Sequence, residues 1–328
     1  MASAPGADLP QIASYPQVRI ASDQLEAQLY LPDAQNGFYQ GTRFDRSGVV
    51  AGLQYRGHQY YGPWFTKRVP QVWDYVDNGV DIVVGRQSAI TGPAEEFPQP
   101  LGFDTAQAGA TFVKLGVGVL GRATDAPYSC YESYEVVDPG TWSVRSTPTS
   151  VECTHRLSDA STGLGCVYSK VVSARGADLV IQHSLLNTGR ATIRAEQYNH
   201  NFLTLDSVPI GPDFLITLPF RIHAPSTLDS ELTAIQGNEI RFVKPLAPGE
   251  VVSFPVVGFT EQSRDYDIRV ENRKTGAGVR VKGDRPLTKL ALWSIRSVLS
   301  MEPFIDVSTE PGGRTDWAYT YTHYVIDM

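Results

Sequence analysis

The sequence predicts an all-β protein of the sandwich or barrel class. Among its 328 residues, 29 Gly and 22 Pro interrupt the chain, and blocks of Ala, Leu, Glu and Lys of helical length are missing. From Thr111 onward, strand-like segments alternate with turns about every 8–12 residues, a spacing typical of sandwiches and barrels. Hydrophobic residues make up 42% of the chain, which is enough for a folded core.

The length of the chain and the absence of a linker indicate how it is divided into domains. A chain of 328 residues could form two average domains, but large all-β proteins often fold as one unit of this size. We find no repeat, coiled coil or low-complexity tract, and no linker that would divide the chain. We therefore expect one domain over residues 1–328, with residues 1–15 as an extended arm.

The first expected strands lie before residue 90. Gln28–Leu31 is followed by the turn sequence Pro32–Gly37, and Val49–Leu53 is the next apolar segment. Residues 86–110 are rich in Gly, Pro and Glu and lack periodicity, so we expect a long loop there. Loops of that length inside compact domains are usually functional.

Later segments continue the pattern of strands and turns. Between Leu179 and Leu185 apolar and polar side chains alternate, which predicts one buried and one wetter face. Leu215–Phe220 and Val251–Phe259 are further strands, each bounded by Pro or Gly. The apolar spacing in Leu287–Leu299 fits either a short helix or a strand.

Charge and hydropathy exclude several partners. The formal net charge is −7 and no run of Lys or Arg occurs, which argues against nucleic acid or an anionic membrane. No apolar stretch approaches the ~18 residues of a membrane-spanning helix, so we expect a soluble protein. The N-terminus lacks the features of a signal peptide, although Ala2–Pro5 resembles the remnant of one. The compartment stays open between the cytoplasm and, if a signal peptide was removed, a periplasmic or secreted location.

Three cysteines leave the redox state open. The turn sequence Asp159–Gly163 lies midway between Cys153 and Cys166, so a hairpin there would place these two cysteines opposite each other. They could form a cross-strand disulfide or remain two reduced thiols. The third cysteine, Cys130, argues against a disulfide framework.

The most informative segment is a run of polar and aromatic residues near the middle of the chain. Side chains in a strand alternate between faces, so one face here carries two charges, a phenol and an imidazole. That face consists of Arg194, Glu196, Tyr198, His200 and Phe202. Such a face is costly to bury and unnecessary on a solvated surface, which indicates a groove for a polar ligand. We therefore place a candidate site at His200.

A carboxylate partner for His200 is predicted in Met301–Val307. Apolar side chains occupy one face of this segment, and Glu302, Phe304 and Asp306 share the other. Glu302 stands directly before a proline and close to a turn. It could be a general base or an ordinary solvated side chain.

The other histidines favour different interpretations. His183 lies on the apolar face of a regular strand, which predicts a satisfied core histidine. His323 ends a stripe of alternate aromatic residues that includes Trp317, and this stripe could stack a sugar ring or simply pack within the sheet. His58 precedes a Tyr-Tyr-Gly-Pro-Trp loop and could lie at the rim of a site.

Two further pairs of charged residues are candidates for binding. Glu95 and Glu96 fall in the expected long loop, where they could bind a cation or a sugar hydroxyl, or be solvated. Arg43 and Arg46 could contact sugar oxygens or pair with Asp45. Phosphate-binding Gly-rich loops, the Gly-x-Ser-x-Gly elbow, the His-Glu-x-x-His helix and Cys-x-x-Cys spacing do not occur, so serine hydrolases and metallopeptidases have no support.

Three segments resemble the galactose mutarotase-like superfamily, which includes aldose 1-epimerases and hexose-phosphate mutarotases. Tyr198–Phe202 is similar to its Asn-His-x-Tyr-Phe-Asn strand, Ser300–Phe304 to its late glutamate segment, and Gly41–Phe44 to its early Gly-Arg-Phe turn. The strand rhythm from Val113 to His323 extends the likeness over most of the chain. The resemblance implies a single large antiparallel β-supersandwich.

The resemblance also implies an activity and its residues. His200 would be the general acid and Glu302 the base of an aldose 1-epimerase, placed on opposite sides of a sugar, with no cofactor. The ligand would be a sugar or oligosaccharide, and a neutral or uronic one because the sequence has no basic cluster to mark a phosphate pocket. The substrate-binding residues would be Arg43, His58, Glu96, Tyr198, Asn199 and Trp317.

One departure from the family keeps alternatives open. The family's second histidine loop has no clear equivalent, since the matching stretch contains Pro93–Phe97 and Leu101–Asp104. This departure could mean another sugar derivative, or a cation held by Glu95 or Glu96 with a histidine. A lyase acting on a glycoside or uronate through His200 and Tyr198, with or without a divalent cation, is the second hypothesis. A binding module without turnover is the third.

Overall fold

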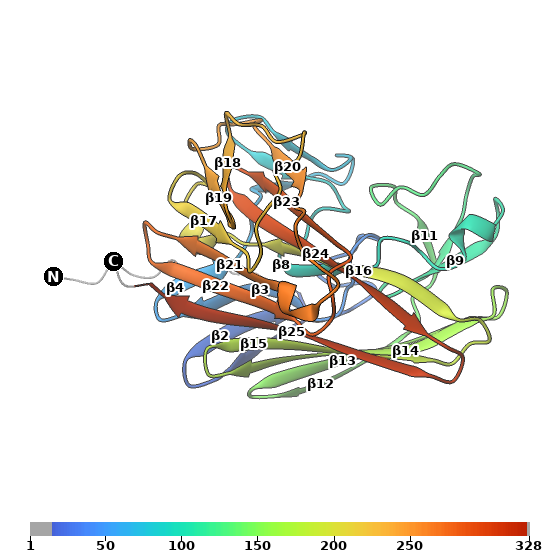
Figure 1. Cartoon of the computed structure of the whole chain (residues 1–328). Helices are drawn as coiled ribbons and strands as arrows, with labels where there is room; N and C mark the ends of the chain where they lie inside the picture. Colours follow the sequence, from blue (N-terminus) through green and yellow to red (C-terminus); the bar gives the residue numbers. More distant parts are fainter. Residues whose placement is uncertain (1–14, 327–328) are drawn as a thin grey trace.

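The computed structural model describes residues 15–326 and contains twenty-five β-strands with three short 3-10 helices (Figure 1). No α-helix occurs within residues 15–326, so the predicted all-β class is confirmed. The expected N-terminal arm and Ala2–Pro5 lie outside the described residues, except for Tyr15. Within the described range, no helix has the length and apolar character needed to cross a membrane.

Five antiparallel or mixed sheets contain all the strands. The largest has ten strands in the order β12 (Thr141–Thr147), β13 (Ser150–Asp159), β14 (Leu164–Arg175), β15 (Asp178–Asn187), β25 (Arg314–Val325), β22 (Ala277–Gly283), β21 (Asp267–Asn272), β17 (Phe214–Thr217), β19 (Glu239–Phe242) and β18 (Thr233–Gln236). The second has five strands in the order β20 (Val252–Pro255), β23 (Lys289–Ile295), β24 (Val298–Thr309), β16 (Ile193–Phe202) and β8 (Gly92–Glu96).

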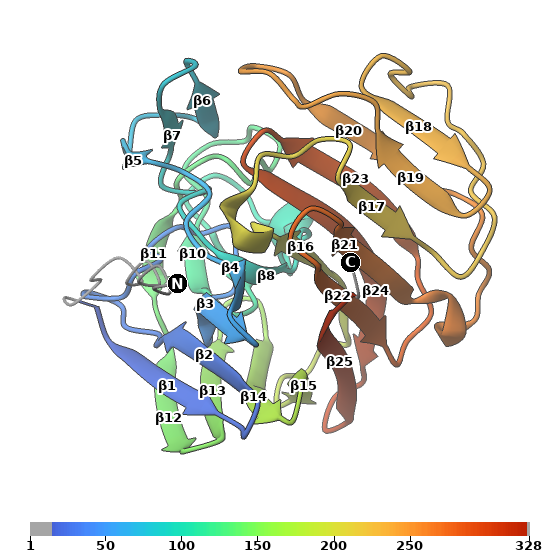
Figure 2. The same ribbon diagram turned by 90° about the vertical axis from the view of Figure 1, so that its left-hand side faces the viewer.

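Three smaller sheets complete the structure. One contains β1 (Gln17–Ala21), β2 (Leu25–Tyr30), β3 (Val49–Tyr55) and β4 (His58–Tyr61). Another contains β11 (Glu135–Asp138), β10 (Gly118–Gly121) and β9 (Thr111–Lys114). The third contains β5 (Lys67–Arg68), β7 (Ile82–Val84) and β6 (Tyr75–Asp77), and Figure 2 shows it standing apart from the β17–β20 strands. The 3-10 helices are η1 (Phe103–Thr105), η2 (Leu205–Ser207) and η3 (Ser263–Asp265).

The ten-stranded and five-stranded sheets pack against each other through the odd-numbered residues of β16. Asn199 donates to Tyr321 of β25 over 3.0 Å, and Tyr319 of β25 donates to Gln197. Buried apolar side chains from both sheets form one cluster around these hydrogen bonds, and its members extend from Ile20 to Tyr321. Because side chains alternate, the even-numbered residues of β16 face away from this interface, as predicted.

One segment differs from the sequence prediction, and the structure decides between the two alternatives left open for another. The long loop expected over residues 86–110 contains β8 and η1, and β8 pairs with β16 along Glu96↔Tyr198 to Gly92↔Phe202. The Gly-Pro-Ala-Glu-Glu sequence of β8 has low β-propensity, so the sequence did not predict a strand there. Hydrogen bonding to β16 holds this segment extended. Leu287–Leu299 proves to be strand, since it contributes to β23 and β24.

The cysteine prediction is wrong in its register. The hairpin closes between Asp159 and Leu164, which places Cys166 opposite Leu157 and Cys153 opposite Lys170. All three cysteines are free thiols. The observed partner of Cys153 lies four residues from Cys166, and the turn sequence alone does not fix the register that closely.

Candidate active site

The outer face of β16 presents Tyr198, His200 and Phe202 side by side. The His200 ring stacks on Phe202 with 3.8 Å between ring centroids, and the Tyr198 ring lies 6.3 Å from it on the other side. Trp293 of β23 contacts the same imidazole edge to face at 5.2 Å. The aromatic neighbours hold the imidazole in one orientation.

Glu302 of β24 lies directly beside His200. Tyr198 pairs with Phe304 in the antiparallel register of β16 and β24, and this register brings Glu302 next to His200. His200 Nε2 and Glu302 Oε1 are 3.1 Å apart, and their side chains are 7% and 15% exposed. The pair is therefore close to the surface without being solvated. The two groups lie side by side, so the expected arrangement on opposite sides of a ligand is not the one observed.

Burial reverses the usual order of the pKa values of the pair. Burial raises the pKa of the Glu302 carboxyl to about 7. Burial, helped by the positive charge of Arg43, lowers the pKa of His200 well below its usual range. The favoured state near neutral pH is consequently an uncharged imidazole beside a carboxyl group that still holds its proton for part of the time.

Arg43 lies near this pair and is held by a buried carboxylate. Its Nε donates to Glu96 Oε2 over 2.8 Å, and its Nη2 donates to the Tyr198 hydroxyl over 3.0 Å. Tyr198 in turn donates to Glu96 Oε2 over 2.6 Å, while Lys114 Nζ lies 3.5 Å from Glu96 Oε1. Burial acts to raise the pKa of Glu96, but the charges of Arg43 and Lys114 outweigh it and the pKa is lowered. Glu96 is therefore an ionised anchor for Arg43.

Two aromatic residues from separate loops form the outer edge of the site. The Arg43 guanidinium lies 4.9 Å from the centre of the Tyr131 ring. Tyr131 contacts Trp73 with 4.1 Å between ring centroids, and Trp73 is 61% exposed. An exposed tryptophan held by a second ring is unusual for a solvated surface and typical of binding surfaces. Sequence analysis missed Trp73, Tyr131 and Lys114; the only signal was the density of aromatics in Tyr128–Tyr134.

The structure brings together five of the residues predicted from the sequence: Arg43, Glu96, Tyr198, His200 and Glu302. The remaining three lie elsewhere. His58 Nδ1 is 2.9 Å from Asp206 Oδ2, Asn199 donates to tyrosine hydroxyls between the two large sheets, and Trp317 is buried against the ring of His183 at 4.8 Å. The aromatic stripe ending at His323 is likewise interior packing, since its four side chains are at most 2% exposed.

The two adjacent carboxylates do not form a common cation site. Glu95 faces the opposite side of β8 from Glu96, where its Oε2 lies 2.7 Å from Lys170 Nζ and 3.0 Å from His183 Nε2. His183 is thus a core histidine, as predicted. Arg46 donates to the main-chain carbonyls of Gln40 and Gly41, so it does not pair with Asp45. Across residues 15–326, no group of three or more His, Cys, Asp or Glu side chains is arranged to hold a metal ion.

Comparisons with known proteins identify the fold. No family model and no curated protein sequence matches this chain. A candidate aldose 1-epimerase of Escherichia coli K12 is 13% identical, with a TM-score of 0.56 over 94% of this chain and 99% of that one. A galactose mutarotase-related enzyme of Lactobacillus acidophilus is 11% identical, with a TM-score of 0.52 over 95% and 100% of the two chains. A galactose mutarotase-like protein of Clostridium acetobutylicum is 10% identical, with a TM-score of 0.52 over 96% of each. The chain therefore has the galactose mutarotase-like fold, as the sequence predicted.

Proposed function

We propose that this galactose mutarotase-like protein acts on carbohydrate as an aldose 1-epimerase-like enzyme, in which His200 and Glu302 exchange protons with a sugar. The observation that carries the proposal is the 3.1 Å contact between the imidazole and the carboxyl group. The pKa of Glu302 is raised to about 7, which is where a general acid–base group works best at neutral pH. The sugar class comes from the fold and from the solved structures that share it.

Interconversion of sugar anomers needs two proton transfers, one at each of the two oxygens bonded to the anomeric carbon. The anomeric hydroxyl loses a proton and the ring oxygen gains one, so that the bond from the anomeric carbon to the ring oxygen breaks and an aldehyde forms. Rotation about the adjacent carbon–carbon bond and closure on the other face give the second anomer. The two oxygens are bonded to the same carbon, so two side-by-side groups can reach both of them from one side. The geometry of His200 and Glu302 fits this requirement.

One proton shared by the pair serves both steps. In the opening step, protonated Glu302 donates to the ring oxygen while neutral His200 accepts the proton of the anomeric hydroxyl. The pair is then an imidazolium and a carboxylate in contact. In the closing step Glu302 takes the proton from the former ring oxygen and His200 returns its proton to the new hydroxyl. In the opening step the two residues exchange the roles that the sequence resemblance implies, in which Glu302 is the base and His200 the acid. The pair ends as protonated Glu302 and neutral His200, as it began, and the two steps require no cofactor.

Arg43 and Tyr198 support this chemistry from the same side. Burial keeps the imidazole uncharged, and the positive charge of Arg43 adds to this effect because a second positive charge nearby is unfavourable. Its guanidinium and the Tyr198 hydroxyl, joined over 3.0 Å, are polar groups close to the pair that could orient sugar hydroxyls. Removing such positioning contacts would reduce the rate because catalysis depends on accurate placement.

The lyase and binding-only hypotheses have weaker support. A lyase would use Tyr198 as the proton-abstracting base, but burial raises the pKa of this tyrosine well above its usual range and keeps the phenol protonated. A binding module has no need for a carboxyl group whose pKa lies near 7. The three hypotheses are separated by the products that each would form.

The test is a panel of free aldoses, uronates and oligosaccharides incubated with the protein. Anomer exchange is followed by NMR, unsaturated products by ultraviolet absorbance, and affinity by calorimetry. Accelerated anomer exchange with at least one sugar supports the proposal. Unsaturated products without accelerated exchange would establish the lyase, and affinity without any reaction would establish a binding module.

A further inference from the structure

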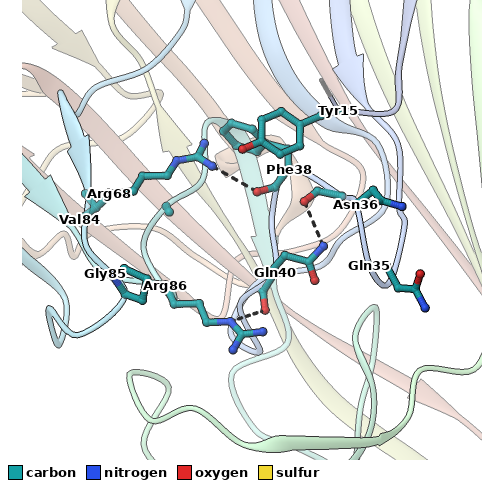
Figure 3. A pocket seen from close by; sticks show the side chains of 12 residues that line it. Tyr15, Gln35, Asn36, Phe38, Gln40, Arg68, Val84, Gly85 and Arg86 are labelled. Carbon is teal, nitrogen blue, oxygen red and sulfur yellow. Dashed lines mark hydrogen bonds between the residues drawn. The ribbon is translucent and has the colours of Figure 1, made fainter. Parts of the chain in front are cut away.

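A cavity lies outside the His200–Glu302 site. It has a volume of about 510 Å³, within the range of about 300–1,000 Å³ of small-molecule sites. Its walls come from Tyr15, the turn between β2 and β3, and the β5–β7 segment (Figure 3). None of Arg43, Glu96, Tyr198, His200 and Glu302 lines it.

Two arginines extend into this cavity from one wall. Figure 3 shows Arg68 and Arg86 reaching toward Phe38 and Gln40 on the facing side. Arg68 donates to the Phe38 carbonyl over 3.4 Å and its guanidinium lies 3.9 Å from the Phe38 ring centre. Arg86 Nε donates to the Gln40 carbonyl over 3.0 Å. Arg68 also lies 6.0 Å from the centre of the Tyr15 ring and 5.3 Å from that of Phe65. These contacts fix the two guanidinium groups, and each guanidinium carries five N–H donors, more than these contacts use.

The positive charge of the cavity is not balanced locally. No Asp or Glu lines it. In the described part of the chain, the arginine ion pairs all involve other arginines: Arg19, Arg43, Arg241, Arg273, Arg280, Arg296 and Arg314. The Asp33 carboxylate, near this turn, is already bound by the backbone N–H groups of Gln35 and Asn36. In a protein with a net charge of −7, two unpaired arginines at one cavity are a local exception.

A third arginine increases the positive charge behind the cavity. Buried Arg46 donates through Nη2 to the same Gln40 carbonyl that Arg86 contacts, over 3.3 Å. Burial lowers the pKa of Arg46, and the charge of Arg86 lowers it further. An anion beside Arg86 would relieve this repulsion between like charges. The arginines lie far apart in the sequence, which is why no basic cluster is visible there.

We propose that this cavity binds a small hydroxylated organic anion, a sugar acid or a sugar phosphate, with its carboxylate or phosphate group held by Arg68 and Arg86. Planar guanidinium groups are well suited to carboxylate and phosphate oxygens. The amide of Asn36 and the side-chain carbonyl oxygen of Gln40 offer hydrogen bonds to hydroxyl groups, and Tyr15 and Pro70 offer apolar contact for the body of the ligand. The proposal does not depend on the reaction at His200 and Glu302.

The test is isothermal titration calorimetry at low ionic strength with four probes: inorganic phosphate, glucuronate, glucose 6-phosphate and glucose. We expect at least one anion to bind and glucose to bind more weakly at this cavity. Binding of glucuronate without phosphate would identify a carboxylate ligand, and the reverse would identify a phosphate ligand. Arg86→Gln, whose side chain is exposed, is expected to weaken anion affinity about ten- to a hundredfold. Arg86→Lys keeps the charge and should recover part of this loss.

Two control variants separate the site from general charge effects. Arg145→Gln removes an exposed positive charge on β12, far from the cavity lining, and should leave affinity unchanged. Arg68→Gln should match Arg86→Gln, with near-ultraviolet circular dichroism confirming that it folds. The proposal is overturned if no anion binds at millimolar concentration, if both cavity variants bind like the wild type, or if Arg145→Gln weakens binding as much as they do.

Discussion

Glu95 and Glu96 are neighbours in the chain whose carboxylates lie on opposite faces of β8 and pair with different cations. Glu95 contacts Lys170 over 2.7 Å between the large sheets, and Glu96 contacts Arg43 over 2.8 Å at the candidate site. This division places one buried ion pair in the core and another at the candidate site, next to Tyr198. The strand β8 therefore couples the stability of the fold to the geometry of the site.

Replacing Arg43 by methionine is expected to destabilise the protein. Arg43 and Glu96 are both buried, so the change leaves a buried carboxylate with only the more distant Lys114 as a cation. Breaking such a pair costs about 3–5 kcal/mol, and the free energy of unfolding from urea titration measures it. The matched control is Arg314→Met, because Arg314 pairs with Asp316 at the exposed surface and should lose less than about 1 kcal/mol. Equal losses in the two variants would contradict this account of Glu96.

Stability is expected to fall as the pH rises through the pKa of Glu302. The folded protein holds this proton more tightly than the unfolded chain, since the pKa is raised from 4.5 to about 7. The contribution is fully present below pH 4.5 and is lost as the pH rises through about 7. The wild type should lose about 3 kcal/mol over this range relative to Glu302→Gln, which has no proton to release. Urea titrations of both proteins near pH 4.5 and above pH 7 measure the difference, and parallel pH profiles would show that Glu302 titrates normally.

Trp73 is expected to contribute to binding rather than to folding. Because its ring is 61% exposed and contacts Tyr131, Trp73→Ala should leave the unfolding temperature nearly unchanged. The KM for the sugar should rise about two- to tenfold, which corresponds to the loss of one aromatic contact. Val80→Ala is the control, since Val80 is 82% exposed in the same segment. A change in kcat with no change in KM would place Trp73 outside the binding surface.

All three cysteines should react as thiols once the protein is unfolded. In the native state Cys130 should be alkylated first, because it is only partly buried. Burial raises the pKa of both Cys153 and Cys166 to about 12, so their thiolate fraction at neutral pH is very small. Mass spectrometry after timed iodoacetamide treatment, with and without urea, follows the order. A mass lower by two hydrogen atoms without reductant would reveal a disulfide instead.

Strand periodicity predicted more of the site than local propensity did. Alternation in β16 and β24 placed His200 and Glu302 on faces that meet once the two strands pair, and both patterns hold in the structure. The resemblance to the galactose mutarotase-like fold is confirmed by solved structures. That residues 1–328 form one domain remains a prediction, and residues 1–14 lie outside the described range.

What the sequence did not predict depends on contacts between distant segments. Lys114 approaches Glu96, and Tyr131 meets Trp73, only after loops from different parts of the chain converge. The same holds for Arg68 and Arg86, which share one cavity. Spacing along the chain carries no information about such contacts, because side-chain periodicity fixes a face and not its partner.

The most direct measurement is the NMR rate of anomer exchange, on the best sugar of the panel, for wild type, His200→Asn and Glu302→Gln. Each substitution should reduce the enzymatic rate by about 10²-fold or more, and the double variant should be no slower than the slower single one, because the two groups share one proton. Asp306→Asn, an exposed carboxylate on the same strand, is the matched control and should retain the wild-type rate. If both site variants exchange anomers as fast as the wild type, His200 and Glu302 are not the catalytic pair.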